Sequence, residues 1–420
     1  MPSIRFAAAA ALLSLLLTAC STPAARPAAT IPVAAAPADP VLLVSIDGFR
    51  ADYLDLGLTP NLARIAREGV RAAWMNPSYP SLTFPNHYSI VTGLRPDRHG
   101  IVHNSMSDAA LGTFRLSDRE AVGNTRWWGG EPIWVGVENA GLPSATMFWP
   151  GSEAEIQGVR PTRWRPFDYA VTPDLRVDDV VGWLSESPAT RPRLATLYFE
   201  KLDSVGHRYG PDSPQAREAL RVIDAAMGRL LAALASRDLL DRVNLIVVSD
   251  HGMATVPPGQ VLAVEDMVAP DDAVVVSIGQ SVGIAPKPGR EAFVESKLLG
   301  AHAQYDCWRK GELPARWHYG RNPRVPPIVC QMHEGWDARP RDDIAKRPNT
   351  ASGSHGFDPA LPSMRALFLA RGPAFRPGTR LPAFDNVDVY PLLARLIGIR
   401  PADNDGDITP LLPALRDGRR

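Results

Sequence analysis

Val41-Leu42-Leu43-Val44-Ser45-Ile46-Asp47-Gly48 contains the first predicted strand of this 420-residue chain and sets the architecture that we expect. A continuous apolar run of this length is typical of a strand that is buried on both faces. Similar runs recur at Leu194–Phe199, Val243–Ser249 and Ala366–Ala370. Because helical patterns lie between them, we predict an α/β fold with a mostly parallel central sheet flanked by helices.

Helices are indicated in three places. Thr59-Pro60 would cap and begin a helix that stops at Gly69, because proline fits the first helical turn and glycine favours helix ends. A longer amphipathic pattern runs from Pro214 to Arg237, and another runs from Val387 to Ile397.

Two stretches interrupt this alternation of strands and helices. Residues from about 105 to 190 are rich in Trp, Pro and Gly, and residues from about 258 to 345 contain many prolines. We expect both to be insertions on the edge of the sheet, the second forming a small lobe. The catalytic domain would then span residues 41–413.

The N-terminus has the features of an export signal. Arg5 precedes an apolar run from Phe6 to Leu17, which is too short to span a bilayer as a stable helix. The run ends Leu17-Thr18-Ala19-Cys20, which resembles a bacterial lipoprotein signal with Cys20 as the lipidated first mature residue. An ordinary signal peptide cut nearby is the alternative. Residues 21–40 read as a stiff Pro/Ala-rich linker. We therefore expect a periplasmic or cell-envelope protein whose one membrane attachment is a lipid anchor at Cys20.

The net charge and the cysteines restrict which partners and which redox compartment we expect for this protein. Lys+Arg and Asp+Glu both number 45, and a net charge of zero argues against a nucleic-acid duplex as partner. A small anionic substrate remains compatible, because bound metal ions can supply positive charge. In an oxidising compartment Cys307 and Cys330 are expected to form a disulfide; two free buried thiols are the alternative. The oligomeric state is not indicated.

Metal-type ligands accompany each predicted strand, at the edge where ligands of open α/β sheets gather. A lone aspartate there is most often a turn residue, so the prediction depends on the whole set. Asp250 and His251 would face opposite sides of a regular strand, and they share one ion only where the backbone turns at Gly252. The set consists of Asp47, Asp203, His207, Asp250, His251 and His355.

The composition of this set predicts two zinc ions per chain. Imidazole combined with carboxylate suits zinc, whereas an all-oxygen set would favour magnesium or calcium. One tetrahedral zinc cannot use all of these ligands, but two open sites can, each with a free position for substrate or nucleophile. Two ions ~4 Å apart clamp the attacking and leaving oxygens of an in-line displacement at phosphorus.

A nucleophile is indicated in Tyr79-Pro80-Ser81-Leu82-Thr83-Phe84-Pro85-Asn86-His87, which leads into a helical run that stops at Gly93. Thr83 is predicted as the N-cap, with Pro85 inside the first turn. A helix N-terminus stabilises anions, so a threonine oxygen there can serve as alkoxide beside a bound phosphate. Coordination to zinc would lower the pKa of the hydroxyl. On local sequence alone, a purely structural cap is the alternative.

Together these segments resemble the nucleotide pyrophosphatase/phosphodiesterase family of the alkaline phosphatase superfamily, over most of residues 41–400. Matching blocks in the right order form a specific signal. They are Ser45–Arg50, Pro80–His87, Gly93–Gly100, Asp203–His207, Ser249–Met253 and Gly353–Gly356.

The resemblance implies how the ligands divide. One zinc would be held by Asp203, His207 and His355. The other would be held by Asp47, Asp250 and His251, and Thr83 would touch this second ion as nucleophile. The implied reaction is a double displacement on a phosphate diester or nucleotide, through a covalent threonine intermediate that water hydrolyses.

Three further residues receive roles from the resemblance alone. Asn104 would donate a hydrogen bond to a non-bridging phosphate oxygen. Phe84 and Tyr198 would flank the leaving or base group of the substrate. Without the family comparison, Asn104 reads as a turn residue and both aromatics read as core packing.

Rival functions stay open to different degrees. A phosphomonoesterase would need additional cationic groups, and no motif-anchored arginine fills that role. A sulfatase would have Cys or Ser followed by Pro and Arg, whereas here Thr83, Pro85 and His87 occupy those positions. A choline-phosphate or lysophospholipid phosphodiesterase is not excluded. A surface-anchored binding protein on a degenerate hydrolase fold is disfavoured, because every expected ligand is present.

Overall fold

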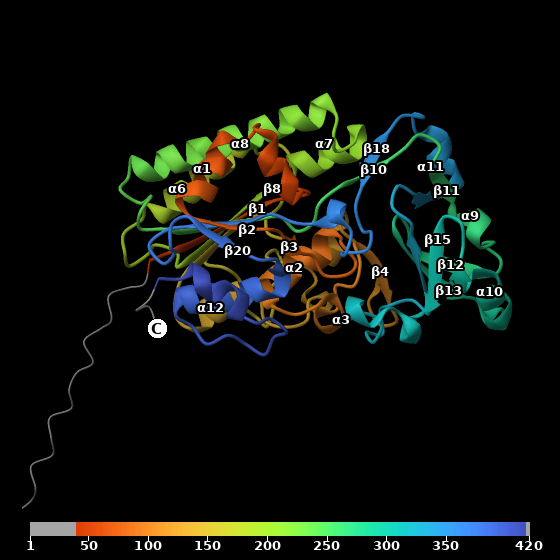
Figure 1. Ribbon diagram of the computed structural model, residues 1–420. Coiled ribbons are helices and arrows are strands. Elements are labelled where there is room, and N and C mark those ends of the chain that lie inside the picture. The colour runs from red at the N-terminus through yellow and green to blue at the C-terminus, as the bar shows by residue number, and fades with distance from the viewer. Residues whose placement is uncertain (1–38, 417–420) are drawn as a thin grey trace, which may run out of the picture. The chain divides into compact units, whose positions relative to one another are not determined.

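The first predicted strand, β1 (Val41–Ile46), lies inside an eight-stranded sheet of order β20-β2-β19-β9-β1-β8-β6-β7 in the computed structural model (Figure 1). All neighbouring strands pair in parallel except β19, which runs antiparallel to both β9 and β2. The predicted α/β class with a mostly parallel sheet is therefore confirmed. The other strands of this sheet are β2 (Val70–Ala72), β6 (Ser144–Met147), β7 (Arg163–Arg165), β8 (Leu194–Phe199), β9 (Asn244–Val248), β19 (Phe368–Arg371) and β20 (Thr379–Leu381).

The structure describes residues 39–416. The predicted signal peptide (1–20), the lipidation site Cys20 and the linker up to residue 38 lie outside the described residues. Within 39–416, no helix combines the length and the apolar composition that a membrane span requires.

Helices cover both faces of the main sheet. The α-helices are α1 (Pro60–Glu68), α2 (Thr83–Thr92), α3 (Pro96–His99), α4 (Arg119–Gly123), α5 (Ile133–Asn139), α6 (Pro173–Leu184), α7 (Lys201–Tyr209), α8 (Pro214–Ala235), α9 (Val264–Met267), α10 (Glu291–Leu298), α11 (Arg341–Lys346) and α12 (Val389–Ile397). Short 3₁₀ helices are η1 (Ala51–Leu56), η2 (Thr125–Trp127), η3 (Lys310–Glu312), η4 (Ala315–Trp317), η5 (Pro362–Met364), η6 (Asn386–Asp388) and η7 (Thr409–Ala414).

Alternation along β1 divides the apolar residues between two cores. Leu42 and Val44 pack with the buried faces of α1, α6 and α8, which lie together on one side of the sheet (Figure 1). Val41 and Leu43 join a second core with α2, α5 and α12 on the other side. Burial on both faces explains why the strand sequence is continuously apolar rather than alternating.

A second, five-stranded sheet of order β12-β13-β16-β15-β14 forms most of a small lobe, which we define as β12–β16 with α9 and α10. The lobe has its own apolar core, and Cys307 and Cys330 face each other across β15 and β16 in a disulfide, as predicted. Its strands are β12 (Ala273–Ser277), β13 (Ser281–Pro286), β14 (Gly300–Ala301), β15 (Tyr305–Arg309) and β16 (Ile328–Met332).

Short two-stranded pairings complete the fold. They are β3 (Met75–Asn76) with β21 (Phe384–Asp385), β4 (Ser105–Asp108) with β5 (Gly112–Arg115), β10 (Ala254–Val256) with β18 (Ser352–Ser354), and β11 (Val261–Ala263) with β17 (Asp337–Arg339). Residues 105–190, expected as an insertion at the sheet edge, supply β6 and β7, the last strands on that edge, and helix α6.

The predicted N-cap at Thr83 is wrong by one residue. The carbonyl of Leu82 accepts the backbone N–H of Asn86, and Leu82 has extended dihedral angles, so Leu82 is the N-cap. Thr83 is the first helical residue. Its hydroxyl is therefore not used to cap the helix.

Candidate active site

The six predicted ligands gather at one edge of the main sheet. Asp47 directly follows β1, Asp203 lies in the first turn of α7 after β8, and Asp250 follows β9. Because these three strands are parallel neighbours, their carboxyl ends meet. The ligand atoms form two groups, with all atoms of a group within 4.8 Å of one another: Asp203, His207 and His355, and Asp47, Asp250 and His251. The resemblance implied this same division.

The three histidines are oriented by backbone carbonyls. In each ring Nδ1 lies at hydrogen-bond distance from a carbonyl oxygen, which can only accept, so Nδ1 carries the proton. The other nitrogen, Nε2, then has a free lone pair facing the group, as is usual for metal-binding histidines. The acceptors are Gly353 O for His207 (3.0 Å), Gly252 O for His251 (2.9 Å) and Ser81 O for His355 (2.9 Å).

Unpaired ligand atoms face one another inside these groups. Nε2 of His207 lies 3.0 Å from Nε2 of His355, and Nε2 of His251 lies 2.9 Å from Oδ2 of Asp250. Because Nδ1 carries the proton in each ring, both contacts place one lone pair against another, which is repulsive. A cation bound between the two atoms would turn this repulsion into attraction. Zn–N bonds of ~2.0–2.1 Å in a tetrahedron place ligand atoms about 3.3 Å apart, close to these separations.

Carboxylate oxygens in the site also lack partners. Among the described residues, Oδ1 of Asp47, Oδ1 of Asp203 and Oδ2 of Asp250 are buried and accept no hydrogen bond. Buried carboxylate oxygens are costly unless they are paired or coordinate metal. The donor set, its orientation and these unpaired atoms therefore fit two metal ions, one in each group.

The pKa values of two ligands are shifted by burial and by neighbouring groups of the same kind. Burial raises the pKa of Asp47 well above its ordinary value, and the nearby carboxylates of Asp250 and Asp203 raise it further. Burial likewise lowers the pKa of His355 well below its ordinary value, with additional lowering by His251 and His207. Both shifts come from like groups crowded in a buried space, a situation that bound cations relieve for the carboxylates.

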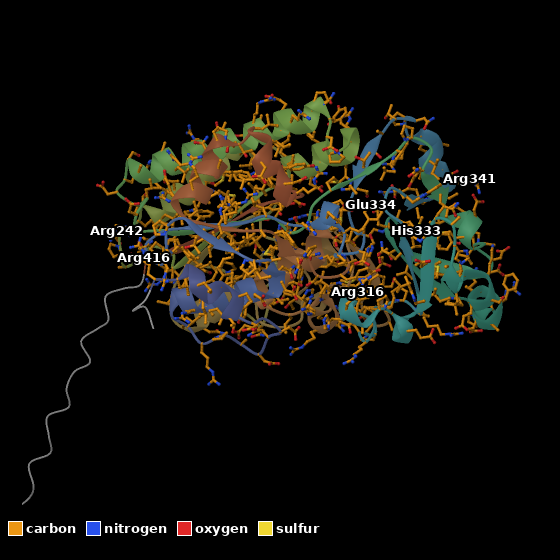
Figure 2. All side chains as sticks on the ribbon, viewed as in Figure 1. Arg242, Arg316, His333, Glu334, Arg341 and Arg416 are labelled. Carbon is orange, nitrogen blue, oxygen red and sulfur yellow. A yellow bond between two sulfur atoms is a disulfide. The ribbon has the colours of Figure 1, made fainter. Side chains whose placement is uncertain are left out.

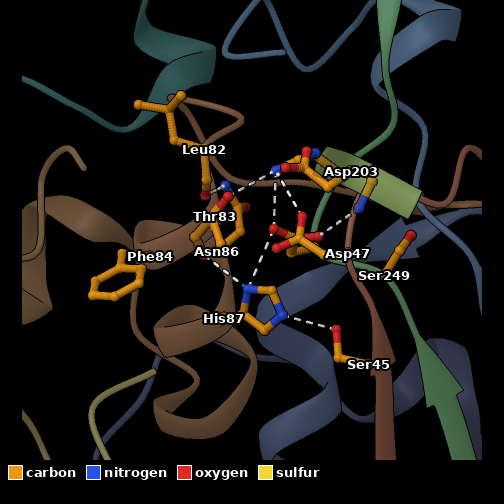
Figure 3. A network of polar contacts seen from close by, with 12 residues as sticks. Ser45, Asp47, Leu82, Thr83, Phe84, Asn86, His87, Asp203 and Ser249 are labelled. Atoms are coloured by element: carbon orange, nitrogen blue, oxygen red, sulfur yellow. Dashed lines mark hydrogen bonds and ion pairs between the residues drawn. The ribbon is translucent and has the colours of Figure 1, made fainter. Parts of the chain in front are cut away.

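Thr83 lies beside the second group. Its Oγ1 is 3.3 Å from Nε2 of His251, and it points toward the same region as Asp47 and Asp203 (Figure 3). At the next residue, the backbone N–H of Phe84 donates to Oδ1 of Asn104 at 2.9 Å. This bond fixes the amide of Asn104 and leaves its Nδ2 donor available to the cavity.

A cavity of about 520 Å³ opens over both groups and is lined by Thr83 and Asn104 as well as the ligands Asp47, Asp203, His207 and His355. Much of its wall is aromatic. The aromatic residues are Phe84, Phe148, Trp149, Phe167, Tyr169 and Tyr198, and Tyr169 is 72% exposed at the mouth. The structure thus brings Phe84 and Tyr198, the two predicted substrate-binding aromatics, to the same cavity.

Tyr198 has a second contact that the sequence did not indicate. Its hydroxyl donates to Oδ2 of Asp47 at 2.6 Å, the oxygen opposite the unpaired Oδ1. Burial raises the pKa of Tyr198 well above its ordinary value, and Asp47 raises it further, so the hydroxyl keeps its proton and remains the donor.

His87 is another buried residue for which sequence reasoning assigned no role. One ring nitrogen lies 2.8 Å from Oγ of Ser45, and the other lies 2.9 Å from the carbonyl oxygen of Thr83 and 3.2 Å from Oδ2 of Asp250 (Figure 3). His87 therefore connects β1, the start of α2 and the second ligand group. The one sequence feature that could have pointed to a role for His87 is its place in the Pro80–His87 block, which resembles the family.

Comparison with known proteins identifies relatives along nearly the whole chain. The family model for type I phosphodiesterase / nucleotide pyrophosphatase matches residues 41–358. Human ectonucleotide pyrophosphatase/phosphodiesterase family member 7 is 38% identical over 89% of this chain and 83% of its own length. A venom phosphodiesterase of Crotalus durissus collilineatus is 37% identical over 87% of this chain, which spans 45% of that protein.

Solved structures agree with this assignment. Murine ectonucleotide pyrophosphatase/phosphodiesterase 5 superposes with a TM-score of 0.85 and 34% identity, covering 90% of this chain and 100% of the solved chain. The same values hold for an inactive form of that protein in complex with AMP. The chain thus belongs to the type I phosphodiesterase / nucleotide pyrophosphatase family.

Proposed function

We propose that this protein hydrolyses phosphate diesters or phosphoanhydrides through a covalent intermediate on Thr83. The observation that carries the proposal is the position of the Thr83 hydroxyl, at the start of α2 and 3.3 Å from a ligand of the second group, in the cavity that opens over both groups. A hydroxyl at that point can reach a phosphate that contacts both groups at once.

The two groups of ligands are proposed to hold one zinc ion each. Imidazole nitrogen together with carboxylate oxygen favours zinc over magnesium or calcium. Zinc bound there would supply Lewis acidity, which lowers the pKa of a coordinated hydroxyl and offsets charge that develops on phosphate oxygens.

The protein's own residues perform the remaining tasks. The Thr83 hydroxyl releases its proton to solvent and Oγ1 forms a bond to phosphorus while the bond from phosphorus to the leaving oxygen breaks; that oxygen takes up a proton from solvent. Water then attacks the same phosphorus, breaks the Oγ1–P bond and restores the hydroxyl. Nδ2 of Asn104 donates to a non-bridging oxygen, and its orientation is fixed in advance by the bond from Phe84 N.

The proposed substrates are small phosphate diesters and nucleotides. The aromatic wall that includes Phe84 and Tyr198 offers flat apolar surfaces for a base or an aromatic leaving group. Relatives named ectonucleotide enzymes and venom phosphodiesterases act outside cells by name, which supports export of this chain. Retention at a cell envelope through Cys20 is part of the same proposal.

The first test compares bis-para-nitrophenyl phosphate, thymidine 5′-para-nitrophenyl phosphate and para-nitrophenyl phosphate, with and without chelator. We expect the two diesters to be preferred and the chelator to abolish turnover. Preference for the monoester would refute the diesterase assignment, and a choline phosphodiester added to the panel tests the lipid-headgroup alternative.

The second test replaces Thr83 by alanine. The variant should lose turnover while it retains about two zinc per chain, because the threonine contributes none of the six carboxylate or imidazole ligands. Thr83→Ser is the matched variant, since it keeps a hydroxyl and should retain part of the activity. Undiminished turnover by T83A would show that another group is the nucleophile, and absence of metal in the wild type would favour a binding protein.

A further inference from the structure

A second cavity of about 490 Å³ lies next to the candidate active site. It is bounded by the end of α7, by the loop 257–259 before β11, by Ile344 of α11 and by the segment from Arg347 to Ser352. His207 lines this cavity as well as the first one. The two cavities therefore meet at a ligand of the first group.

A chain of contacts links this cavity to the nucleophile through both ligand groups. Thr83 contacts His251, whose ring stacks on His355 with centroids 3.6 Å apart. His355 in turn contacts His207, which lines the second cavity. Beginning at the nucleophile, the order is thus Thr83, the second ligand group, the first ligand group and the second cavity.

In-line displacement requires the leaving group to depart opposite the attacking oxygen. Because Thr83 contacts the second ligand group, a leaving oxygen opposite it would face the first ligand group, and whatever is attached to that oxygen would extend toward His207. The second cavity, which His207 also lines, offers space for this attached group beside the first ligand group.

The lining of this cavity is positively charged. It includes the guanidinium groups of Arg208 and Arg347, the polar residues Asn349, Thr350 and Ser352, and no Asp or Glu among its described residues. Arg208 makes no ion pair within residues 39–416; its Cζ lies 5.2 Å from the centroid of the Tyr209 ring.

Arg347 forms an ion pair with Asp337, and Arg339 binds the same carboxylate. Nη1 of Arg347 lies 3.0 Å from Oδ2 of Asp337, and the same oxygen accepts from Nε of Arg339 at 2.9 Å. Asp337 is buried, and one carboxylate cannot neutralise two guanidinium groups. Arg347 is therefore both positioned and left with positive charge to offer an anion.

We propose that the second cavity binds an anionic leaving group, that is, the terminal phosphate part of a phosphoanhydride such as a nucleoside triphosphate. This inference rests on the proposed function, and it specifies which scissile bonds that function prefers. A diester with an uncharged leaving alcohol gains nothing from Arg208 and Arg347, whereas a departing pyrophosphate has charges and acceptor oxygens for both.

The experiment compares ATP with thymidine 5′-para-nitrophenyl phosphate in the variants Arg208→Gln and Arg347→Gln. We expect kcat/KM for ATP to fall about 10- to 100-fold in each variant, the loss typical of one charge-assisted hydrogen bond, while the nitrophenyl ester changes less than about twofold. The inhibition constant of inorganic pyrophosphate against the nitrophenyl ester should rise by a similar factor. Arg208→Lys and Arg347→Lys should retain part of the preference.

Matched controls come from α7, which contains Arg208, and from α11, which directly precedes Arg347. Lys201→Gln on α7 and Arg341→Gln on α11 remove a positive charge from residues that do not line the cavity. Arg341, labelled in Figure 2, is exposed and forms its ion pair with Asp266 of α9. Both variants should behave as wild type with both substrates.

Equal losses on the two substrates, or none on either, would overturn the proposal. If the wild type hydrolyses neither substrate, the proposed function fails, while unchanged pyrophosphate binding by calorimetry in R208Q and R347Q would separately overturn the anion site.

Discussion

His207, His251 and His355 receive their ligand form from the main chain. In each ring Nδ1 donates a hydrogen bond to a carbonyl oxygen, so the lone pair on Nε2 of the neutral imidazole faces the site. Since carbonyl acceptors come from the backbone, side-chain substitutions nearby do not remove them. The backbone conformation of the loops after β9 and β18, together with the packing of α7, therefore determines how the three imidazoles are oriented.

Asp47 depends instead on a side chain, which leads to a testable difference. Tyr198→Phe removes the donor to Oδ2 of Asp47 and should weaken zinc binding at the second group about 10–100-fold, the usual effect of losing such a supporting bond. Tyr88→Phe is the matched control, because the buried Tyr88 hydroxyl has no partner among the described residues. Competition with a chelator of known affinity measures both variants. Equal zinc affinities would show that the Tyr198 hydroxyl does not support the ligand.

A buried histidine outside the site predicts acid sensitivity. Burial lowers the pKa of His99 to about 3, although a bond to the carbonyl of Pro85 opposes the shift. The folded state therefore binds fewer protons than the unfolded state between about pH 6.5 and 3. The stabilising contribution is complete above pH 6.5 and is lost as pH falls through that window, by about 1.4 kcal/mol per pH unit.

The check is urea unfolding of wild type and His99→Gln at pH 7, 6 and 5. The difference between their free energies of unfolding should shrink with acid, because the variant lacks this titration. His318→Gln, which removes an exposed histidine, serves as control. A pH-independent difference would mean that His99 binds a proton equally well in the folded and the unfolded protein.

At the scale of elements, buried strands and strand-end ligands could be predicted because both follow from local patterns. Continuous apolar runs mark β1, β8 and β9, and parallel neighbours bring their carboxyl ends together. The antiparallel direction of β19 was not predictable, since it depends on how the chain returns from the lobe. The Tyr198–Asp47 bond was equally hidden, because it joins residues 151 positions apart through tertiary packing.

The lobe offers a prediction of its own. The disulfide between Cys307 and Cys330 closes a loop with a sequence separation of 23, and losing it should cost about 3 kcal/mol of unfolding free energy by the loop-entropy estimate. The double variant C307S/C330S should therefore unfold at lower denaturant, with the change confined to the transition that reports the lobe. Turnover of the nitrophenyl diester should be unchanged, because neither cysteine lines either large cavity. An unchanged transition would contradict the estimate.

For the whole molecule, metal binding should couple to stability. The two ligand groups tie together β1, β9, α7 and the turn after β18, and ions that bind only this assembled arrangement stabilise it. At a free zinc concentration a hundredfold above Kd, each site adds about 2.7 kcal/mol. Chelation should lower the melting temperature, and added zinc should restore it better than magnesium. Identical melting curves would show that the groups hold no ion in the folded protein.

The division of ligands between ions, and the roles of Asn104 and Phe84, came from family resemblance rather than from pattern. Periodicity places a residue on an element, but it does not place two elements against each other. The arginine-lined cavity shows this limit clearly, because Arg208 and Arg347 lie on opposite sides of the lobe in sequence and carry no motif.

The ligands of the two groups occur at different positions along the chain, so that an emerging chain would have all ligands of the second group before it has all ligands of the first. Asp47, Asp250 and His251, with Thr83, all precede residue 252, whereas the first group waits for His355, after the lobe and its disulfide. In a chain that crosses a membrane from its N-terminus, Thr83 and the ligands of the second group would emerge before the first group has its last ligand. Cys307 and Cys330 would likewise emerge before His355, so that oxidation of this pair would not have to wait for the complete first group.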